Sequence, residues 1–373
     1  MSSTGFNIDD YSDIEPLPLD VPNNATVLND DGKEGKDTGS DAELCRILYS
    51  DEYRLLMGIA RSLIEKNELS VRSLVLTSKI IEMVPAFYTI WNFRYRVIEN
   101  LLNQESKLTS VSTDNDADPD SEKDSKDKFS AILNNELDWL DEVTLSNPKN
   151  YQIWSYRQAL LKNLHPSPSM KRELPIISLM LDDDTKNYHV WSHRKWCCIF
   201  FNDYSNELTF TRAYIDRDVY NNSAWNHRMF LFKKLKAQGD GVLNSAAAND
   251  ELEFCMRKIE FVPQNVSSWN YLRGLLELFY PGDTSDNNAT IARVLKFTEK
   301  FIANADFVNQ GEEKWGPDLP DIESSYALEF YAHLKAKDPE GIPVAIAAYR
   351  ALARKYDPIR EHLWNHKIQL LTQ

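Results

Sequence analysis

One short pattern recurs along this chain and constrains its fold more than any other feature. Five of the nine tryptophans sit in one aligned context, and a sixth copy is weaker. The copies are FYTIWNFRY (87–95), NYQIWSYRQ (150–158), NYHVWSHRK (187–195), NNSAWNHRM (221–229), NVSSWNYLR (265–273) and REHLWNHKI (360–368). Self-similarity at a period of about 20 to 50 residues is the sequence signature of a repeat protein.

The spacing of these tryptophans indicates the size of the repeated unit. Three of the gaps are 37, 34 and 44 residues, and each fits one helical hairpin. The first gap, 63 residues, shrinks to about 38 once an acidic insert at 104–128 is removed. The last gap, 95 residues, leaves room for a degenerate copy around SSYALEF (324–330).

Each copy is expected to begin a helix, because an asparagine stands four residues before the tryptophan at Asn150, Asn187, Asn221 and Asn265. Asparagine favours that position since its side chain can accept from the exposed N–H groups of the first turn. Intervening segments such as 133–146 and 172–184 supply the second helix of each hairpin. The predicted fold is all-α, an α-solenoid of repeated antiparallel helical hairpins with a concave binding surface.

The simplest interpretation of the tryptophans and of the arginines that follow them is that they pack the fold. The indole is expected to fill the core between hairpins, and the stem of Arg94, Arg157, Arg194 or Arg228 to lie over it with its head in water. A tetratricopeptide array has a similar period, but it requires a Leu-Gly pair, Tyr, Ala and Pro at set offsets. Those offsets are missing here.

Charge and cysteine content narrow the function class. The net charge is −15, of which residues 1–42 carry −8 and residues 104–128 carry −4, leaving −3 for the rest. We expect a disordered acidic tail (1–42), a disordered insert (about 104–128) and one repeat domain over 43–373. The chain lacks the basic patch that nucleic acid requires, an apolar run of membrane-spanning length and a signal-peptide pattern. Four irregularly spaced cysteines fit a reducing, cytoplasmic location.

The repeat Asn-Tyr-x-x-Trp-x-x-Arg resembles that of protein prenyltransferase α subunits, from about Leu44 to the C-terminus. Finer features resemble the fungal α subunit shared by farnesyltransferase and geranylgeranyltransferase type I. They are DYSDIEPLPLD (10–20), PAFYTIWNFRYRV (85–97), ELDWLDEVTLSNPKNYQIWSYRQ (136–158), DDDTKNYHVWSHRKWCC (182–198) and SSYALEFYAHL (324–334). The acidic insert departs from the family pattern, as does the copy at 265–273, whose arginine falls one place late at Arg273.

The resemblance implies a heterodimeric enzyme that transfers an isoprenoid to the cysteine of a C-terminal CaaX motif. The helical hairpins would form a crescent around a β subunit, either of farnesyltransferase or of geranylgeranyltransferase type I. Substrates would be farnesyl or geranylgeranyl diphosphate and CaaX-terminated proteins such as small GTPases. The β subunit would hold zinc, and the farnesyl reaction would use magnesium. Consistent with this, the seven histidines are dispersed, and we expect adjacent Cys197 and Cys198 to be buried structural residues, so no metal site is expected in this chain.

The resemblance also implies roles for residues at the tips of the early repeats. Lys149 matches the lysine that reaches the isoprenoid diphosphate, where a fixed cation would stabilise charge on the leaving group. Gln152 matches the residue that hydrogen-bonds the CaaX carboxylate. Others match positions that line the substrate site: Tyr88, Tyr151, Asn187, Tyr188 and His189. Without the resemblance, Lys149 is a solvated lysine before a helix and the aromatic residues belong to the repeat core.

Two other functions are compatible with the same helical repeat. The α subunit of Rab geranylgeranyltransferase carries the same repeat, but the fungal CaaX-type segments argue against it. A non-enzymatic helical scaffold is the second alternative, and the pairing of Lys149 with Gln152 argues against that.

Overall fold

The computed structural model describes residues 5–19, 27–28, 34–35, 48–111, 119–239, 245–282 and 284–373. Helices dominate these ranges, and the only strands within them are the two-residue β1 (Val27–Leu28) and β2 (Glu34–Gly35), which pair antiparallel. The chain divides into two compact units, Met1–Met180 and Leu181–Gln373. The all-α class predicted from the repeat is confirmed.

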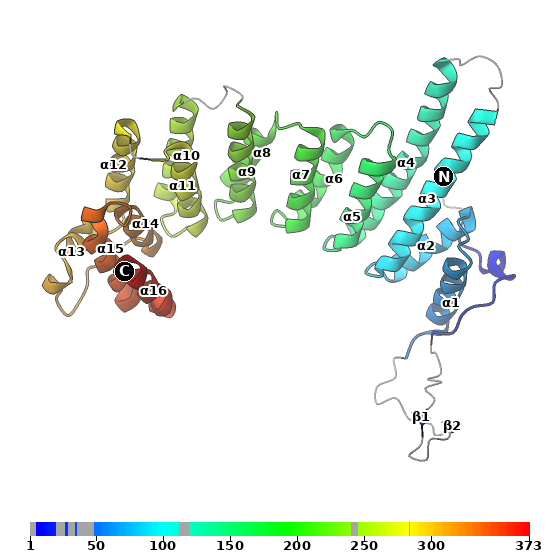
Figure 1. Ribbon diagram of the computed structural model, residues 1–373, viewed down its shortest axis with the longest axis horizontal. Coiled ribbons are helices and arrows are strands. Elements are labelled where there is room, and N and C mark those ends of the chain that lie inside the picture. The colour runs from blue at the N-terminus through cyan, green and yellow to red at the C-terminus, as the bar shows by residue number, and fades with distance from the viewer. Residues whose placement is uncertain are drawn as a thin grey trace. The chain divides into compact units, whose positions relative to one another are not determined.

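The first unit is a series of packed helices, the last of which crosses its boundary. In chain order they are α1 (Asp51–Glu65), α2 (Val71–Met83), α3 (Tyr88–Val111), α4 (Pro119–Ser146), α5 (Tyr151–Ala159) and α6 (Met170–Asp183). A 3₁₀ turn (Ile8–Tyr11) precedes them, and a π-helical turn (Leu160–Leu164) extends α5. Consecutive helices pack from α1 to α5, and α3 also contacts α5, as stacked hairpins require (Figure 1).

The second unit continues the same architecture. Its helices are α7 (Tyr188–Phe201), α8 (Glu207–Arg217), α9 (Asn222–Gln238), α10 (Ser245–Phe261), α11 (Val266–Phe279), α12 (Ser285–Glu299), α13 (Asp306–Asn309), α14 (Ser325–Lys335), α15 (Ile342–Ala351) and α16 (Glu361–Leu371). Shorter turns are 3₁₀ at Ala303–Ala305, Glu312–Lys314, Pro339–Gly341 and Pro358–Arg360 and π at Leu352–Tyr356. Helices α7, α9, α11 and α14 contact one another in turn, so α14 occupies the place of the degenerate copy at 324–330.

The predicted asparagine caps are confirmed. The side-chain oxygen of each accepts from a backbone N–H in the first turn of its helix, over 2.8 to 3.2 Å. The capped helices begin at Tyr151, Tyr188, Asn222 and Val266. A cap of this kind satisfies one of the four N–H groups that a helix leaves without an internal partner.

The signature tryptophans fill the core between hairpins, as expected. All six are at most 5% exposed. Two of these rings meet a tyrosine ring of the following signature helix, with centroids 5.2 Å apart for Trp91 and Tyr156 and 4.9 Å apart for Trp225 and Tyr271. Contacts of this geometry add to the burial of apolar area and tie one hairpin to the next.

The signature arginines differ from the prediction that their heads lie in water. All four are at most 5% exposed, and each donates two hydrogen bonds of 2.5 to 2.9 Å to one buried glutamate of the next helix. The pairs are Arg94–Glu136, Arg157–Glu173, Arg194–Glu207 and Arg228–Glu251. A guanidinium in the interior needs such a partner because an unpaired buried charge costs several kcal/mol. The prediction from the side chain's length alone was therefore wrong.

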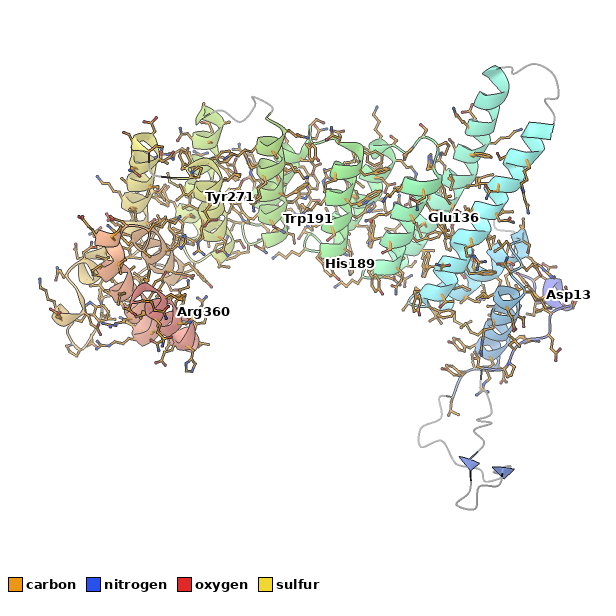
Figure 2. The ribbon with its side chains drawn as sticks, viewed as in Figure 1. Asp13, Glu136, His189, Trp191, Tyr271 and Arg360 are labelled. Atoms are coloured by element: carbon orange, nitrogen blue, oxygen red, sulfur yellow. The ribbon has the colours of Figure 1, made fainter. Side chains whose placement is uncertain are left out.

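In three of these ion pairs, a third side chain also hydrogen-bonds the glutamate. The side chain two residues after the tryptophan hydrogen-bonds the glutamate of its own hairpin: Tyr156 with Glu136, His227 with Glu207 and Tyr271 with Glu251, each over 2.7 to 2.8 Å. Figure 2 labels Glu136 and Tyr271, members of two of these clusters. Each glutamate thus joins its own hairpin, through the tyrosine or histidine, to the preceding one, through the arginine.

Two segments expected to be disordered are folded in part. Residues 5–19 of the acidic tail pack on α1 and α2, with Tyr11 and Ile14 buried and the Tyr11 hydroxyl donating to the Arg72 carbonyl over 2.7 Å. The backbone N–H of Leu17 donates to the carbonyl of Gly58. In the insert, α3 and α4 extend to Val111 and from Pro119, so helix replaces the expected loop there. Apart from β1 and β2, the remaining residues of the tail lie outside the described ranges, as do residues 112–118 of the insert.

Candidate functional site

The tip of α5 carries three of the predicted site residues in sequence. Lys149 is exposed in the turn that joins α4 to α5, where the N–H of Asn150 donates to the carbonyl of Asn147 over 3.1 Å. Tyr151 opens the helix and is 61% exposed. Gln152 follows, and its backbone N–H donates to the side chain of Asn150 over 2.8 Å. Cap and turn together fix the backbone on both sides of the lysine.

The same tip is fastened to the turn that precedes α3. The side-chain amide of Asn150 donates to the carbonyl of Pro85 over 2.7 Å, and that of Gln152 donates to the carbonyl of Ala86 over 3.2 Å. Tyr88 follows this turn and is 71% exposed. The structure therefore brings Tyr88, Tyr151, Gln152 and Lys149 into one tip region. The amide of Gln152 has a second N–H that can donate to a ligand carboxylate.

The second unit holds the other three predicted residues at the tip of α7. Asn187 is 4% exposed and caps the helix, so its amide oxygen is engaged with the N–H of His189. Tyr188 is 66% exposed, and its ring lies 3.9 Å from that of His189, centroid to centroid. Figure 2 labels His189 on this helix, near Trp191. Burial lowers the pKa of His189, so its imidazole is neutral near pH 7 and can both donate and accept.

Lys186 holds the same repeat position as Lys149, and its surroundings define its role. Its ammonium lies 2.8 Å from the carboxylate of Asp218. Burial alone would raise the pKa of Asp218, but the hydrogen bond from Lys186 holds that pKa below its usual value. Lys186 therefore serves an ion pair on the surface of its own unit.

One buried cluster in the second unit was missed by the argument from sequence spacing. Cys198, Glu207 and His227 offer ligand atoms within 4.8 Å of one another. The Glu207 carboxylate, however, already accepts from both Arg194 and His227, and burial raises the pKa of the Cys198 thiol. A cation would have to compete with the guanidinium for the carboxylate, so these residues do not fit a zinc site.

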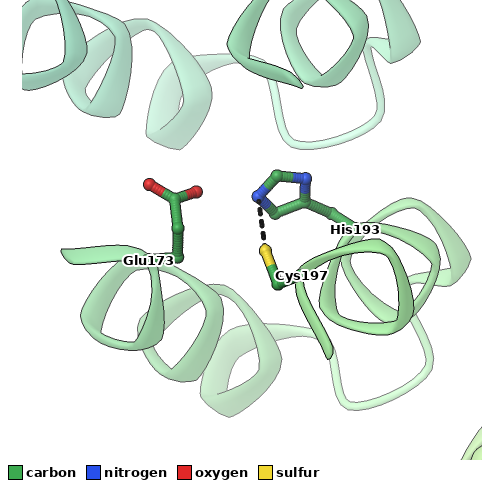
Figure 3. A group of neighbouring side chains, drawn as sticks. All are labelled: Glu173, His193 and Cys197. Carbon is green, nitrogen blue, oxygen red and sulfur yellow. Dashed lines mark hydrogen bonds between the residues drawn. The ribbon is translucent and has the colours of Figure 1, made fainter. Parts of the chain in front are cut away.

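The neighbouring Cys197 is likewise an interior residue. Its sulfur lies 3.4 Å from the Nε2 atom of His193, one helical turn earlier (Figure 3). Both cysteines are fully buried, as predicted.

Among the helices that the structure describes, none has the length and apolar character needed to cross a membrane.

The repeat and the full chain both match known proteins. The family model "Protein prenyltransferase alpha subunit repeat" matches residues 133–164, 170–200, 204–235 and 248–279. The Candida albicans farnesyltransferase/geranylgeranyltransferase type-1 subunit alpha is 31% identical over 370 residues, 97% of each chain. The corresponding Pisum sativum subunit is 26% identical over 98% of this chain and 94% of its own.

Two further comparisons separate the related enzymes. The type-2 geranylgeranyl transferase subunit alpha of Mus musculus is 29% identical, but the match covers 66% of this chain and 42% of that protein. A solved structure, Candida albicans protein geranylgeranyltransferase-I complexed with GGPP, matches with a TM-score of 0.71 and 31% identity, over 97% of this chain and 98% of that chain. Of these relatives, the two type-1 subunits match over more than nine-tenths of their length, whereas the type-2 subunit matches over less than half of its own.

Proposed function

Because the chain belongs to the α subunits of protein farnesyltransferase/geranylgeranyltransferase type I, we propose that it works as a heterodimer with the β subunits of both enzymes. The substrates would be farnesyl or geranylgeranyl diphosphate and proteins with a C-terminal CaaX motif, among them small GTPases. The observation that carries the proposal is the α5 tip, where the Asn150 cap holds the backbone between Lys149 in the turn and Gln152 in the helix.

Lys149 is the proposed catalytic residue of this chain. In the reaction, the cysteine sulfur forms a bond to the first carbon of the isoprenoid while the bond from that carbon to the diphosphate oxygen breaks. The electron pair leaves on the diphosphate, which therefore gains negative charge in the transition state. A cation fixed at that position stabilises the transition state more than the ground state and so raises the rate.

The other tip residues are proposed to bind substrate. Gln152 would donate an amide N–H to the terminal carboxylate of the CaaX peptide, without adding charge. Tyr88, Tyr151, Tyr188 and His189 would line the substrate site at the subunit boundary, with Tyr188 against the isoprenoid. Asn187 would act chiefly through the cap that places Tyr188 and His189, because its side chain is buried.

The metals of the reaction are proposed to lie outside this chain's described residues. The buried cluster of Cys198, Glu207 and His227 does not fit zinc, because the guanidinium of Arg194 already pairs with the carboxylate of Glu207. The family resemblance assigns zinc to the β subunit, where its chemistry would be to hold the substrate cysteine as a thiolate. Magnesium is proposed for the farnesyl reaction, and a cytoplasmic location stays a prediction.

Co-expression with each candidate β subunit tests this function. We expect the purified chain alone to be inactive, and the heterodimer with a farnesyltransferase or type-I β subunit to add the matching isoprenoid to a CaaX peptide, detected by mass spectrometry. Activity only with a type-2 β subunit would assign the chain to the other enzyme. Binding of a CaaX-type β subunit without transfer to any peptide would favour a scaffold role.

A further inference from the structure

A line of shared carbonyls runs through the repeats. In four repeats, the carbonyl six residues before the tryptophan accepts the indole N–H of its own repeat and also the side chain of the residue that caps the next signature helix. The carbonyl of Pro85 accepts from Trp91 over 2.9 Å and from Asn150 over 2.7 Å. That of Val219 accepts from Trp225 over 2.8 Å and from Asn265 over 2.7 Å. One oxygen therefore links two consecutive repeats.

The same arrangement recurs at two more places with one change of residue. The carbonyl of Thr185 accepts from Trp191 and Asn221 over 2.9 and 2.8 Å. The carbonyl of Pro263 accepts from Trp269 over 2.8 Å and from the hydroxyl of Ser324 over 2.6 Å. Ser324 also caps α14 through the N–H of Ala327. A serine can thus perform both functions of the asparagine in this fold.

At the α5 tip this common device lies within the residues proposed to act on substrate. Lys149 precedes Asn150, and Tyr151 and Gln152 follow it. Asn150 and Gln152 donate to consecutive carbonyls, those of Pro85 and Ala86. We propose that Asn150 is a positioning residue for prenyl transfer, which holds the Lys149–Gln152 tip against the turn before Tyr88. This inference rests on the proposed function of that tip.

The physical reason is the sensitivity of the reaction to the placement of Lys149. The stabilisation that a cation gives to a leaving diphosphate depends on the distance between the two charges. A displacement of about 1 Å by a residue outside the chemistry can slow a reaction by about 100-fold. The lysine side chain is long and flexible, so its placement depends on the backbone that the Asn150 side chain fastens.

The chain contains a matched control for this role. Asn265 makes the same two bonds, to Val219 and to the N–H of Ser267, at a tip where Gln264 and Val266 have no proposed role. Asn265 is 1% exposed, whereas Asn150 is half-buried. Replacement of Asn265 should therefore lower the free energy of unfolding at least as much as replacement of Asn150. A variant of Asn265 therefore reports the loss of stability alone, whereas a variant of Asn150 should also lower the rate of transfer.

The test uses the heterodimer with its β subunit, farnesyl diphosphate and a CaaX peptide under single-turnover conditions. In such a measurement, a smaller folded fraction lowers the amplitude, whereas misplacement of Lys149 lowers the rate constant. We expect Asn150→Ala to lower the rate constant by about 10- to 100-fold. Asn150→Gly should do the same while nearly preserving the cap. Asn150→Ser should recover most of the rate, and Asn265→Ala should leave the rate constant unchanged.

A double variant shows whether Asn150 acts through the lysine. Lys149→Ala/Asn150→Ala should be no more than about twofold slower than Lys149→Ala alone, because residues that act as a unit are not additive. A normal rate constant in Asn150→Ala and Asn150→Gly, or an equal loss in Asn265→Ala, would overturn the inference. So would effects of Lys149 and Asn150 that multiply. If Lys149→Ala is slow and both Asn150 variants are normal, the proposed function stands without the inference, whereas a harmless Lys149→Ala removes both.

Discussion

The buried interior of the hairpins and their exposed tips repeat together along the chain but vary to different degrees. In the interior, the tryptophan and the buried glutamate recur in four successive hairpins, and the arginine of each preceding hairpin pairs with that glutamate. At the tips, the residue before the capping asparagine changes from Lys149 and Lys186 to Tyr220 and Gln264. The interior therefore specifies the stacking of hairpins, and the tips are where one repeat can differ from another in function.

This contrast predicts two classes of variant. A change in the interior should lower the free energy of unfolding, because it opens a cavity or leaves a buried charge without its partner. A change of an exposed side chain at a tip should leave the free energy of unfolding nearly unchanged and act on binding or rate.

The largest effect on stability is expected from Trp191→Ala. The indole is 5% exposed, donates to the carbonyl of Thr185 and packs against Phe210 and Tyr214. We expect a loss of about 3–5 kcal/mol in the free energy of unfolding, measured by denaturant titration, with the loss spreading to neighbouring hairpins. Tyr188→Ala, three residues earlier and exposed, is the control and should change unfolding little. Wild-type stability in Trp191→Ala would contradict the interior assignment.

The next largest loss of stability is expected at low pH, when Glu207 becomes protonated. Burial alone would raise the pKa of this carboxyl, but hydrogen bonds from His227 and Arg194 lower it from 4.5 to about 2. Its contribution to stability is therefore complete above pH 4.5 and is lost as the pH falls from 4.5 through about 2. The wild type should lose roughly 3 kcal/mol over that range through this group.

The variant Glu207→Gln isolates that contribution. It should be less stable than the wild type at neutral pH, and its free energy of unfolding should fall less steeply between pH 4.5 and 2. Denaturant titrations at several pH values measure the slope. Equal slopes in the two proteins would show that Glu207 does not carry this pH dependence.

A smaller effect is expected where residues 5–19, the N-terminal arm, pack on α1 and α2. Tyr11→Phe removes the hydrogen bond to the carbonyl of Arg72 and should cost about 1 kcal/mol, seen as a lower melting temperature. Tyr220→Phe, on an exposed ring, is the control. An unchanged melting temperature in Tyr11→Phe would mean that the arm contributes little, as expected from its acidic composition.

The sequence predicted the repeat, the caps and the buried tryptophans because these depend on local patterns. It did not predict the buried ion pairs, since the glutamate that meets each arginine lies on another helix at a separation of 42, 16, 13 or 23 residues. A signal was present: a glutamate stands 18 residues before four of the tryptophans, as Glu136 does before Trp154. That constant offset reflects both helices of one hairpin and could have identified the partner.

The tip residues could be recognised only through the family resemblance. Lys149 and Lys186 hold the same repeat position, and nothing in the local pattern tells a catalytic lysine from one in a surface ion pair. The folded arm was missed because acidic composition concealed the few apolar contacts of Tyr11 and Ile14. The hydrogen bond of Tyr11 to the carbonyl of Arg72 spans 61 residues, a separation that a local pattern does not record.

The smallest stability effect is expected from Lys186→Ala. This variant removes an exposed ion pair with Asp218, and such pairs contribute about 0.2–1 kcal/mol. The change in melting temperature should shrink further in high salt, because screening weakens exposed pairs. A loss as large as that of Trp191→Ala would mean that this tip belongs to the interior.

The same two lysines provide the most direct test of the division between interior and tips. Lys149→Ala and Lys186→Ala are each combined with a β subunit, and single-turnover rates are measured beside melting temperatures. We expect Lys149→Ala to melt like the wild type and to slow the chemical step by roughly 100- to 1,000-fold, as loss of one charge-stabilising donor does. Lys186→Ala should transfer at the wild-type rate. If the two variants transfer equally fast, Lys149 is a solvated repeat residue, and the assignment of catalysis to the α5 tip is wrong.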